Sequence, residues 1–180
     1  MDHMVDFSSG DIVKVHSDQL KVFKEHALDN TEKKRYRYCL QESPQNMLHD
    51  MLLCRTRGDY TRPDNHNGIP ESHTIIEGQE LIVLFSDDGI ITDAFVLDRD
   101  SGYLSYRINA DVYHLTIPLT EIAIDYEVKL GPFRADSNIF PSWAPDGTDK
   151  EDAMKFWMET ERKAKELMKT CGGSGVHVTV

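Results

Sequence analysis

The sequence predicts a mainly β protein, a small antiparallel barrel or jelly roll with an N-terminal helix and a C-terminal helical extension. Between residues 47 and 130, short apolar runs alternate with turn residues, and no helix-length pattern lies between them. Asp88 and Gly89 join two of these runs, and Asp-Gly in that position is a strong hairpin signal. Short strands at such close spacing favour an antiparallel sandwich or barrel.

Residues 1–46 are expected to form a segment in front of the barrel. Its first ten residues are polar and are expected to fray, and residues 12–15 are typical of a short strand. Ser17 is a plausible N-cap for a helix that runs to about Ala27. The apolar side of this helix is expected to hold Leu20, Val22 and Phe23.

A basic run with interleaved tyrosines, KKRYRY at residues 33–38, follows the helix. We favour an edge strand whose charges face water, because exposed charge discourages pairing with a further strand. Stacking and phosphate contacts with a nucleic acid are a second interpretation. A third is contact with an anionic substrate or partner, because this is the densest positive charge in an acidic chain.

The barrel is expected to span residues 47–131. Its first strand covers the apolar run 47–55, and Ile75 and Ile76 lead into the turn at Gly78. The remaining strands are expected at residues 81–85, 90–97, 102–108, 112–117 and 122–130. A small barrel of this kind can hold one ligand in its mouth.

Residues 132–180 are expected to wrap along the barrel and then form an amphipathic helix. Prolines interrupt the first part, where Phe133, Phe140 and Trp143 are the expected packing anchors. Thr148 or Asp149 is expected to cap a helix that runs to about residue 170. Its apolar face is interpreted as core or dimer packing.

Composition excludes several classes of function. The 180 residues carry a net charge of −11 with a pI near 5.1, which argues against binding to a nucleic-acid backbone. Three cysteines without CxxC spacing favour a reducing compartment, and Cys54 is expected in the core. The first residues lack a signal-peptide pattern, and no run of 18 apolar residues exists, so we expect a cytoplasmic protein without a membrane span.

The segment from Gly58 to Gly78 holds the chemistry. Side chains alternate across a strand, so Asp64 and His66 are expected on one face, and Glu71 and His73 likewise share a face after the NGIP turn. Carboxylate and imidazole ligands together suit Mn, Fe, Zn or Ni better than Ca or Mg.

This segment resembles the first motif of the cupin superfamily, in which glycines at the positions of Gly58 and Gly78 frame ligands at those of His66 and Glu71. Asp64 stands where the family pattern has its first histidine. Over about residues 12–146 the sequence is similar to WbuC-type cupins, small proteins associated with bacterial surface-polysaccharide gene clusters. The matching pieces are Met51–Leu53, Gly58–Tyr60, Arg62–Pro63, Glu71–Ser72, Glu77–Gly78 and Glu127–Phe133.

The resemblance implies one divalent transition metal (Fe, Mn, Zn or Ni) held by Asp64, His66, Glu71 and His114. His114 lies where the second cupin motif places its histidine. Glu71 either binds the metal or acts beside it as a general base with a raised pKa. His73 is a second catalytic candidate, with a packed, hydrogen-bonded histidine as the alternative. A barrel that has lost its metal is the alternative for the whole set.

Substrate contacts are expected from residues near these ligands. Arg62 could pair with a carboxylate or phosphate, and its parity with Asp64 makes it a better candidate than Arg107. The other candidates are Tyr60, Tyr106, Tyr113 and His49.

These features leave the enzyme class open. The resemblance implies a metal-binding cupin that acts as an isomerase or epimerase on a sugar or nucleotide-sugar intermediate of surface-polysaccharide biosynthesis. The alternatives are an Fe(II)-dependent dioxygenase and a non-catalytic ligand-binding or sensor barrel. The expected partners are a small-molecule substrate and a second copy of the chain as a homodimer, with neither nucleic acid nor membrane.

Overall fold

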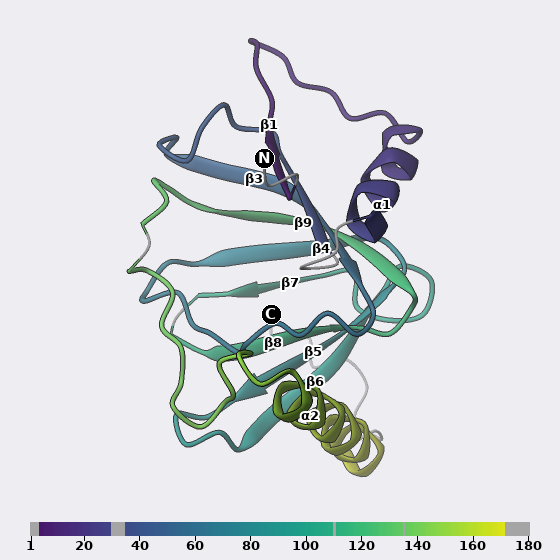
Figure 1. Cartoon of the computed structure of the whole chain (residues 1–180), viewed down its shortest axis with the longest axis vertical. Helices are drawn as coiled ribbons and strands as arrows, with labels where there is room; N and C mark the ends of the chain where they lie inside the picture. Colours follow the sequence, from purple (N-terminus) through teal and green to yellow (C-terminus); the bar gives the residue numbers. More distant parts are fainter. Residues whose placement is uncertain (1–3, 30–34, 110, 135, 172–180) are drawn as a thin grey trace, which may run out of the picture.

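The computed structural model describes residues 4–29, 35–109, 111–134 and 136–171, and it shows two facing β-sheets with a helix on the outer side of each (Figure 1). The large sheet has the order β1-β2-β3-β9-β4-β7, and the small sheet has the order β6-β5-β8. The elements are β1 (Val5–Phe7), α1 (Gln19–Asp29), β2 (Arg35–Cys39), β3 (Leu48–Thr56), β4 (Glu71–Glu77), β5 (Gln79–Phe85), β6 (Ile91–Asp98), β7 (Ser105–Ile108), β8 (Tyr113–Pro118), β9 (Ile122–Leu130) and α2 (Lys150–Cys171). The predicted fold class, mainly β with two flanking helices, is confirmed.

Strand pairing follows the predicted turns. β5 and β6 form the antiparallel hairpin around Gly89, whose φ of 84° is a conformation that glycine adopts without strain. Gly78 also has a positive φ, and a side chain there would come within 2.6 Å of the Ile122 carbonyl oxygen. β9 is central in the large sheet because it pairs with both β3 and β4.

Helix α1 covers the outer face of the large sheet. Phe23 is buried and packs on Tyr36 and Tyr38 of β2, with ring centroids 5.3 and 5.0 Å apart. Val22, predicted on the apolar side, is instead 46% exposed. Because side chains alternate along β2, these two tyrosines on the helix side place Arg35 and Arg37 on the opposite, inner face.

Three predictions about the N-terminal segment are wrong. Residues 5–7 form β1 instead of fraying, whereas residues 12–15 are not a strand. β1 pairs with β2 in parallel, so β2 is not an edge strand. Arg35 and Arg37 line the cavity and are only partly exposed, so their charges do not stand on a free outer edge. Lys33 and Lys34 of the same run lie outside the described residues.

Helix α2 packs against the outer face of the small sheet. Ala153, Trp157 and Ala164 are buried, and they join Leu81 and Leu115 in one apolar cluster. Asp149 caps the helix, since its Oδ1 accepts hydrogen bonds from the backbone N–H groups of residues 151 and 152. The apolar face of α2 is therefore core packing, as the first of the two interpretations expects.

The wrap between β9 and α2 differs in part from prediction. Trp143 packs on Phe85, with ring centroids 5.0 Å apart, but Phe133 and Phe140 are 54% and 49% exposed and do not anchor it. Cys54 is buried, as expected. Neither described helix offers an apolar stretch long enough to cross a bilayer.

Candidate metal centre

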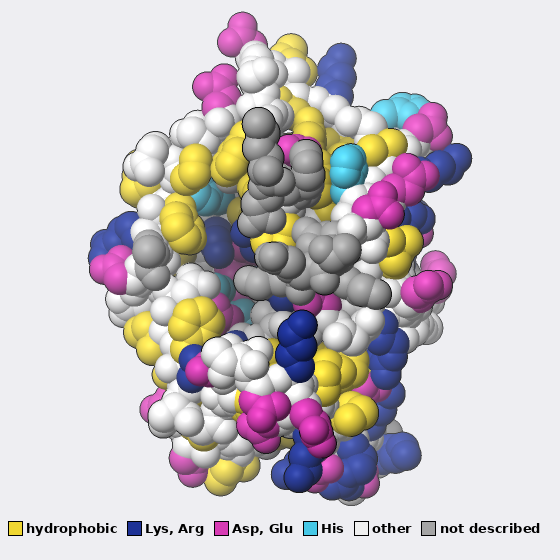
Figure 2. Space-filling model, in the orientation of Figure 1, with side chains coloured by type: hydrophobic (Ala, Val, Ile, Leu, Met, Phe, Trp, Pro, Cys, Tyr) yellow, Lys and Arg dark blue, Asp and Glu magenta, His cyan; other side chains and the backbone are white. Residues whose placement is uncertain are grey.

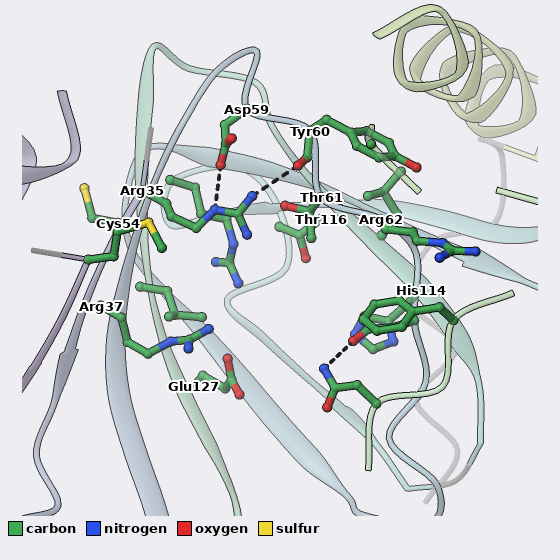
Figure 3. Close-up of a pocket in the computed structure, with 18 of the residues that line it drawn as sticks. Arg35, Arg37, Cys54, Asp59, Tyr60, Thr61, Arg62, His114, Thr116 and Glu127 are labelled. Atoms are coloured by element: carbon green, nitrogen blue, oxygen red, sulfur yellow. Dashed lines mark hydrogen bonds and ion pairs between the residues drawn. The ribbon is translucent and has the colours of Figure 1, made fainter. Parts of the chain in front are cut away.

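A cavity of about 760 Å³ lies between the sheets. Its lining comes from β2, β3, β4, β8 and β9, together with the loop that follows β3 and the segment that leads into α2. In Figure 2, histidine, acidic and basic side chains are visible together in the hollow to the left of centre. Figure 3 shows Arg35 and Arg37 reaching into this space from β2, with His114 across it.

The loop after β3 is fixed by pairing with distant parts of the chain. Asp64 and His114 exchange backbone hydrogen bonds of 3.3 and 3.0 Å, and Asn65 pairs in the same way with Ile139. Residues 67 and 68 both have positive φ in the turn closed by the His66 carbonyl oxygen. Asp111 accepts a hydrogen bond from the backbone N–H of Gly68. Asp64 and His66 thus lie at a short bridge and a turn, whereas the sequence suggested a strand.

Three of the four predicted ligands come together. Asp64, His66 and His114 each offer one ligand atom within 4.8 Å of the others. Glu71 lies against both histidines: its Oε2 is 2.8 Å from His66 Nε2, and its Oε1 is 2.9 Å from His114 Nε2. All four side chains line the same cavity, and Glu71 is only 1% exposed.

Neighbouring groups orient these donors. His114 Nδ1 lies 3.1 Å from the Val112 carbonyl oxygen, which leaves Nε2 directed toward Glu71. Asp64 Oδ2 accepts a 2.7 Å hydrogen bond from Asn138 Nδ2. Among the described residues, His66 Nδ1 is buried without a hydrogen-bond partner. Two imidazoles, a nearby carboxylate and an unpaired buried nitrogen fit a transition-metal ion.

The pKa values of the cluster reflect mutual contact. Burial raises the pKa of Asp64, although His114 and His66 lower it. Burial would also raise the pKa of Glu71, but contacts with His114, His66 and His73 hold it well below its usual range. Burial would lower the pKa of His114, whereas Glu71 and Asp64 raise it. These contacts favour the carboxylate form of Glu71, so the raised pKa expected for a general base at this position is wrong.

A buried polar chain continues behind Glu71. His73 Nε2 is 3.6 Å from Glu71 Oε1, and His73 Nδ1 is 2.6 Å from Asp125 Oδ2. Arg55 contacts both Asp125 and Glu80. Burial would lower the pKa of His73, but Asp125 and Glu71 raise it to about 10. His73 is therefore held between two carboxylates, and it touches the cluster only through Glu71.

Two predicted substrate residues line the cavity but already have partners. The hydroxyl of Tyr60 donates a 2.8 Å hydrogen bond to the Pro145 carbonyl oxygen. Arg62 Nη2 donates to the Pro141 carbonyl oxygen at 2.6 Å, and its guanidinium lies over the ring of Phe140. Both side chains hold the wrap segment against the barrel.

The other three substrate candidates are not among the described residues that line the cavity. Tyr106 stacks on His73 inside the barrel, with ring centroids 5.0 Å apart. Tyr113 faces the other side of β8, where it packs against Trp143. His49 lies beside Gly131, with its Nε2 3.1 Å from the Pro44 carbonyl oxygen. The prediction that these three side chains contact the cavity is therefore wrong, because the direction and register of their strands point them elsewhere.

Sequence reasoning missed several groups around the cluster. Glu127 and Lys129 point inward from β9 and lie 3.1 Å apart, and Asn138 reaches Asp64 from the wrap. The alternation of charge in Glu127–Lys129 was an available signal, because two charged residues two apart share one face of a strand. Asn138 gave no signal in the sequence, because it meets Asp64 only through tertiary folding.

Comparison with known proteins gives the fold. A family described as "Domain of unknown function (DUF6016)" matches residues 15–97, under half of the chain. No curated protein matches the sequence. The structure of CapF with the inhibitor 3-isopropenyl-tropolone superposes with a TM-score of 0.52 at 13% identity, over 62% of this chain and 33% of that chain.

Two further structures are less similar. Oxalate oxidase in complex with the substrate analogue glycolate has a TM-score of 0.49 at 14% identity, over 81% of this chain and 76% of that one. The Schizosaccharomyces pombe Cnp3 cupin domain has a TM-score of 0.44 at 10% identity, over 56% and 67%. This chain spans about a third of the CapF chain, so that likeness concerns the fold and not the activity. The two facing sheets and the match to CapF show that the chain has a cupin fold.

Proposed function

We propose that this protein is a metal-dependent cupin that binds one divalent transition metal through Asp64, His66 and His114. The observation that carries the proposal is the meeting of these three side chains, from separate parts of the chain, at one wall of a buried cavity. Two imidazoles and one carboxylate favour Fe, Mn, Zn or Ni. A cavity of about 760 Å³ is of the size that takes a small metabolite.

In this proposal Glu71 lies beside the metal and transfers protons, which its contacts with His66 and His114 support. A bound ion would supply Lewis-acid polarisation of a substrate oxygen. Glu71 is buried and held as a carboxylate, the form that can accept a proton from a substrate carbon or hydroxyl, although its contacts with the histidines lower its pKa and so weaken it as a base. His73, held by Asp125, lies behind Glu71 with its Nε2 3.6 Å from Glu71 Oε1, and its charge favours the carboxylate form of Glu71.

These roles suit an isomerase or epimerase that acts on a small polar metabolite. A proton taken from one carbon by Glu71 and returned to another position needs no further reactant. The likeness to WbuC-type cupins supports a sugar or nucleotide-sugar intermediate of surface-polysaccharide biosynthesis as that metabolite. The polar lining of the cavity is compatible with a substrate rich in hydroxyl groups.

A second candidate is an Fe(II)-dependent dioxygenase. The observation in its favour is the donor set itself, since two histidines with one carboxylate is the set that non-haem Fe(II) oxygenases use. Oxygen uptake by the iron-loaded protein with a panel of sugars and organic acids distinguishes it from an isomerase, which consumes none.

Metal analysis tests the proposal. Protein purified without added metal and then loaded separately with Mn, Fe, Zn or Ni should retain about one ion per chain of at least one metal after desalting. His66→Ala and His114→Ala should lose most of it, because each removes a ligand. His49→Gln is the matched control, since His49 lies outside the cavity lining, and it should retain the metal.

A wild-type protein that retains none of the four metals would contradict the proposal. Equal metal content in wild type, His66→Ala and His114→Ala would place the ion elsewhere and would contradict it as well.

A further inference from the structure

Arg37 faces the cavity, and its side chain has no hydrogen-bond or ion-pair partner among the described residues. Its neighbours along β2, Tyr36 and Tyr38, pack under helix α1, so Arg37 faces the cavity. In the part of the chain that the structure describes, its side chain makes no hydrogen bond or ion pair, and its Nε is buried. Arg37 is partly buried, and a buried N–H donor without a partner costs free energy, so the unbonded Nε calls for a reason beyond folding.

The other arginines of the cavity have protein partners. Arg35 Nε lies 2.6 Å from Asp59 Oδ2, and its Nη2 donates to the Tyr60 carbonyl oxygen at 3.1 Å. Arg62 and Arg55 are held by the wrap and by the buried carboxylates, as described above. Arg37 is therefore the cavity arginine whose donors are free to bind a ligand.

Glu127, a carboxylate of the same cavity, makes no ion pair with Arg37 among the described contacts. It is paired instead with Lys129 at 3.1 Å. Burial would raise the pKa of Glu127, but the positive charges of Lys129, His73 and Arg37 lower it to about 2. Arg37 thus acts on Glu127 only at a distance, and the N–H donors of Arg37 stay without a bonded partner among the described residues.

The position of Arg37 also suits a molecule that reaches the metal centre. β2 and β4 are three strand steps apart in the sheet order, or about 14 Å along the sheet. Arginine extends from β2 into the cavity, and His114 lies across it (Figure 3). A small metabolite fits in the remaining space.

We propose that Arg37 binds an oxyanion, the carboxylate or phosphate group of a small anionic substrate whose other end lies at the metal centre. That the bound anion is a substrate rests on the proposed function. The anion site itself can be tested without metal. A guanidinium pairs with both kinds of oxyanion through two parallel hydrogen bonds. An anionic substrate is also the natural partner of a cationic wall inside a chain whose net charge is −11.

Calorimetric titration of the metal-free protein with inorganic phosphate and, separately, with succinate tests this site. The wild type should bind at least one of the two, and Arg37→Met should bind it about tenfold or more weakly, as expected for the loss of a charge-assisted hydrogen bond. Tighter binding of phosphate indicates a phosphate ester, and tighter binding of succinate indicates a carboxylate.

Two further variants control the titration. Arg107→Met removes an exposed arginine from β7 that is outside the cavity lining, and it should bind as the wild type does. Arg37→Lys keeps the charge but loses the two-pronged geometry, so it should bind more weakly than wild type, and it provides the test if Arg37→Met does not fold. Because the guanidinium has no partner, Arg37→Met should melt at the wild-type temperature or above it.

Binding of neither anion by the wild type would overturn the inference, and so would equal binding by the wild type and the Arg37 variants. Metal loading of a separate portion of each preparation, followed by metal analysis, separates this result from the proposed function. A protein that takes no metal yet binds anions through Arg37 would contradict only the proposed function. A protein that takes metal but shows no role for Arg37 would contradict only this inference.

Discussion

At the scale of single residues, Asp64 and Glu71 occupy different environments although both are carboxylates in one cluster. Asp64 is held from the side by Asn138 and remains partly exposed to the cavity. Glu71 is almost fully buried and touches both histidine Nε2 atoms. Burial dominates the pKa of Asp64, whereas contact with histidines dominates that of Glu71. The environment of Asp64 suits a metal ligand, and that of Glu71 suits a carboxylate that exchanges protons beside the metal.

This difference predicts the metal content of two variants. Glu71→Gln keeps the shape of the side chain and should retain about one ion per chain, as a residue beside the metal does. Asp64→Ala removes a ligand and should lose most of the ion at the same free metal concentration. Mass spectrometry of the metal in desalted protein is the measurement. Loss of the ion in Glu71→Gln and its retention in Asp64→Ala would show that Glu71 is a ligand and that Asp64 is not.

The sequence predicted the cluster around Glu71, but it did not predict that Arg37 faces this cluster across the cavity. The resemblance to the cupin motifs predicted that His66, Glu71 and His114 meet, and they do. Strand parity alone would not have placed them, because His66 lies at a turn and His114 comes from a distant strand. The inward position of Arg37 depends instead on which face of β2 lies under α1. The alternation of arginine and tyrosine is the same for either face, so sequence alone could not decide it.

At the scale of elements, both helices cover outer sheet faces, and charged side chains occupy part of the space between the sheets. Strands with clear turns and apolar runs, such as β5, β6 and β9, follow from sequence within a few residues. β1 does not, because a strand of three residues exists only through its pairing with β2. Residues 12–15 have a strand-like composition but find no partner strand.

A charged cluster joins the sheets through β5, β3 and β9. Glu80 of the small sheet and Asp125 of the large sheet share the guanidinium of Arg55, and His73 lies on the other side of Asp125. Burial and the charge of Asp125 raise the pKa of Glu80 to about 8, although Arg55 and His73 lower it. One guanidinium between two carboxylates leaves the second of them protonated near neutral pH.

This raised pKa predicts a pH dependence of stability. The folded protein keeps a proton on Glu80 up to about pH 8, whereas the unfolded chain releases it near 4.5. Stabilisation from this proton is therefore fully present below about 4.5 and is lost as the pH rises through 8. Glu80→Gln cannot titrate, so its free energy of unfolding should fall less over this range, by on the order of a few kcal/mol.

Urea unfolding at several pH values between about 5 and 8 measures the slope. Glu121→Gln, on the exposed surface, is the control and should follow the wild type. An unchanged slope in Glu80→Gln would show that Glu80 is charged in the folded protein.

At the scale of the whole molecule, the cupin fold places the candidate metal ligands, among them His114, across the cavity from Arg35 and Arg37. The chain needs both sheets for this arrangement, since His114 comes from the small sheet and Glu71 and Arg37 come from the large one. The predicted segments 1–46, 47–131 and 132–180 all contribute residues to the cavity lining. Homodimer formation stays a prediction.

Anomalous diffraction from crystals of the protein loaded with whichever of Mn, Fe, Zn or Ni it retains tests the central claim most directly. We expect one strong anomalous peak at about 2.0–2.3 Å from the carboxylate of Asp64 and from one imidazole nitrogen each of His66 and His114. A peak elsewhere, or two histidine rings that remain on Glu71 with no peak between them, would contradict the claim.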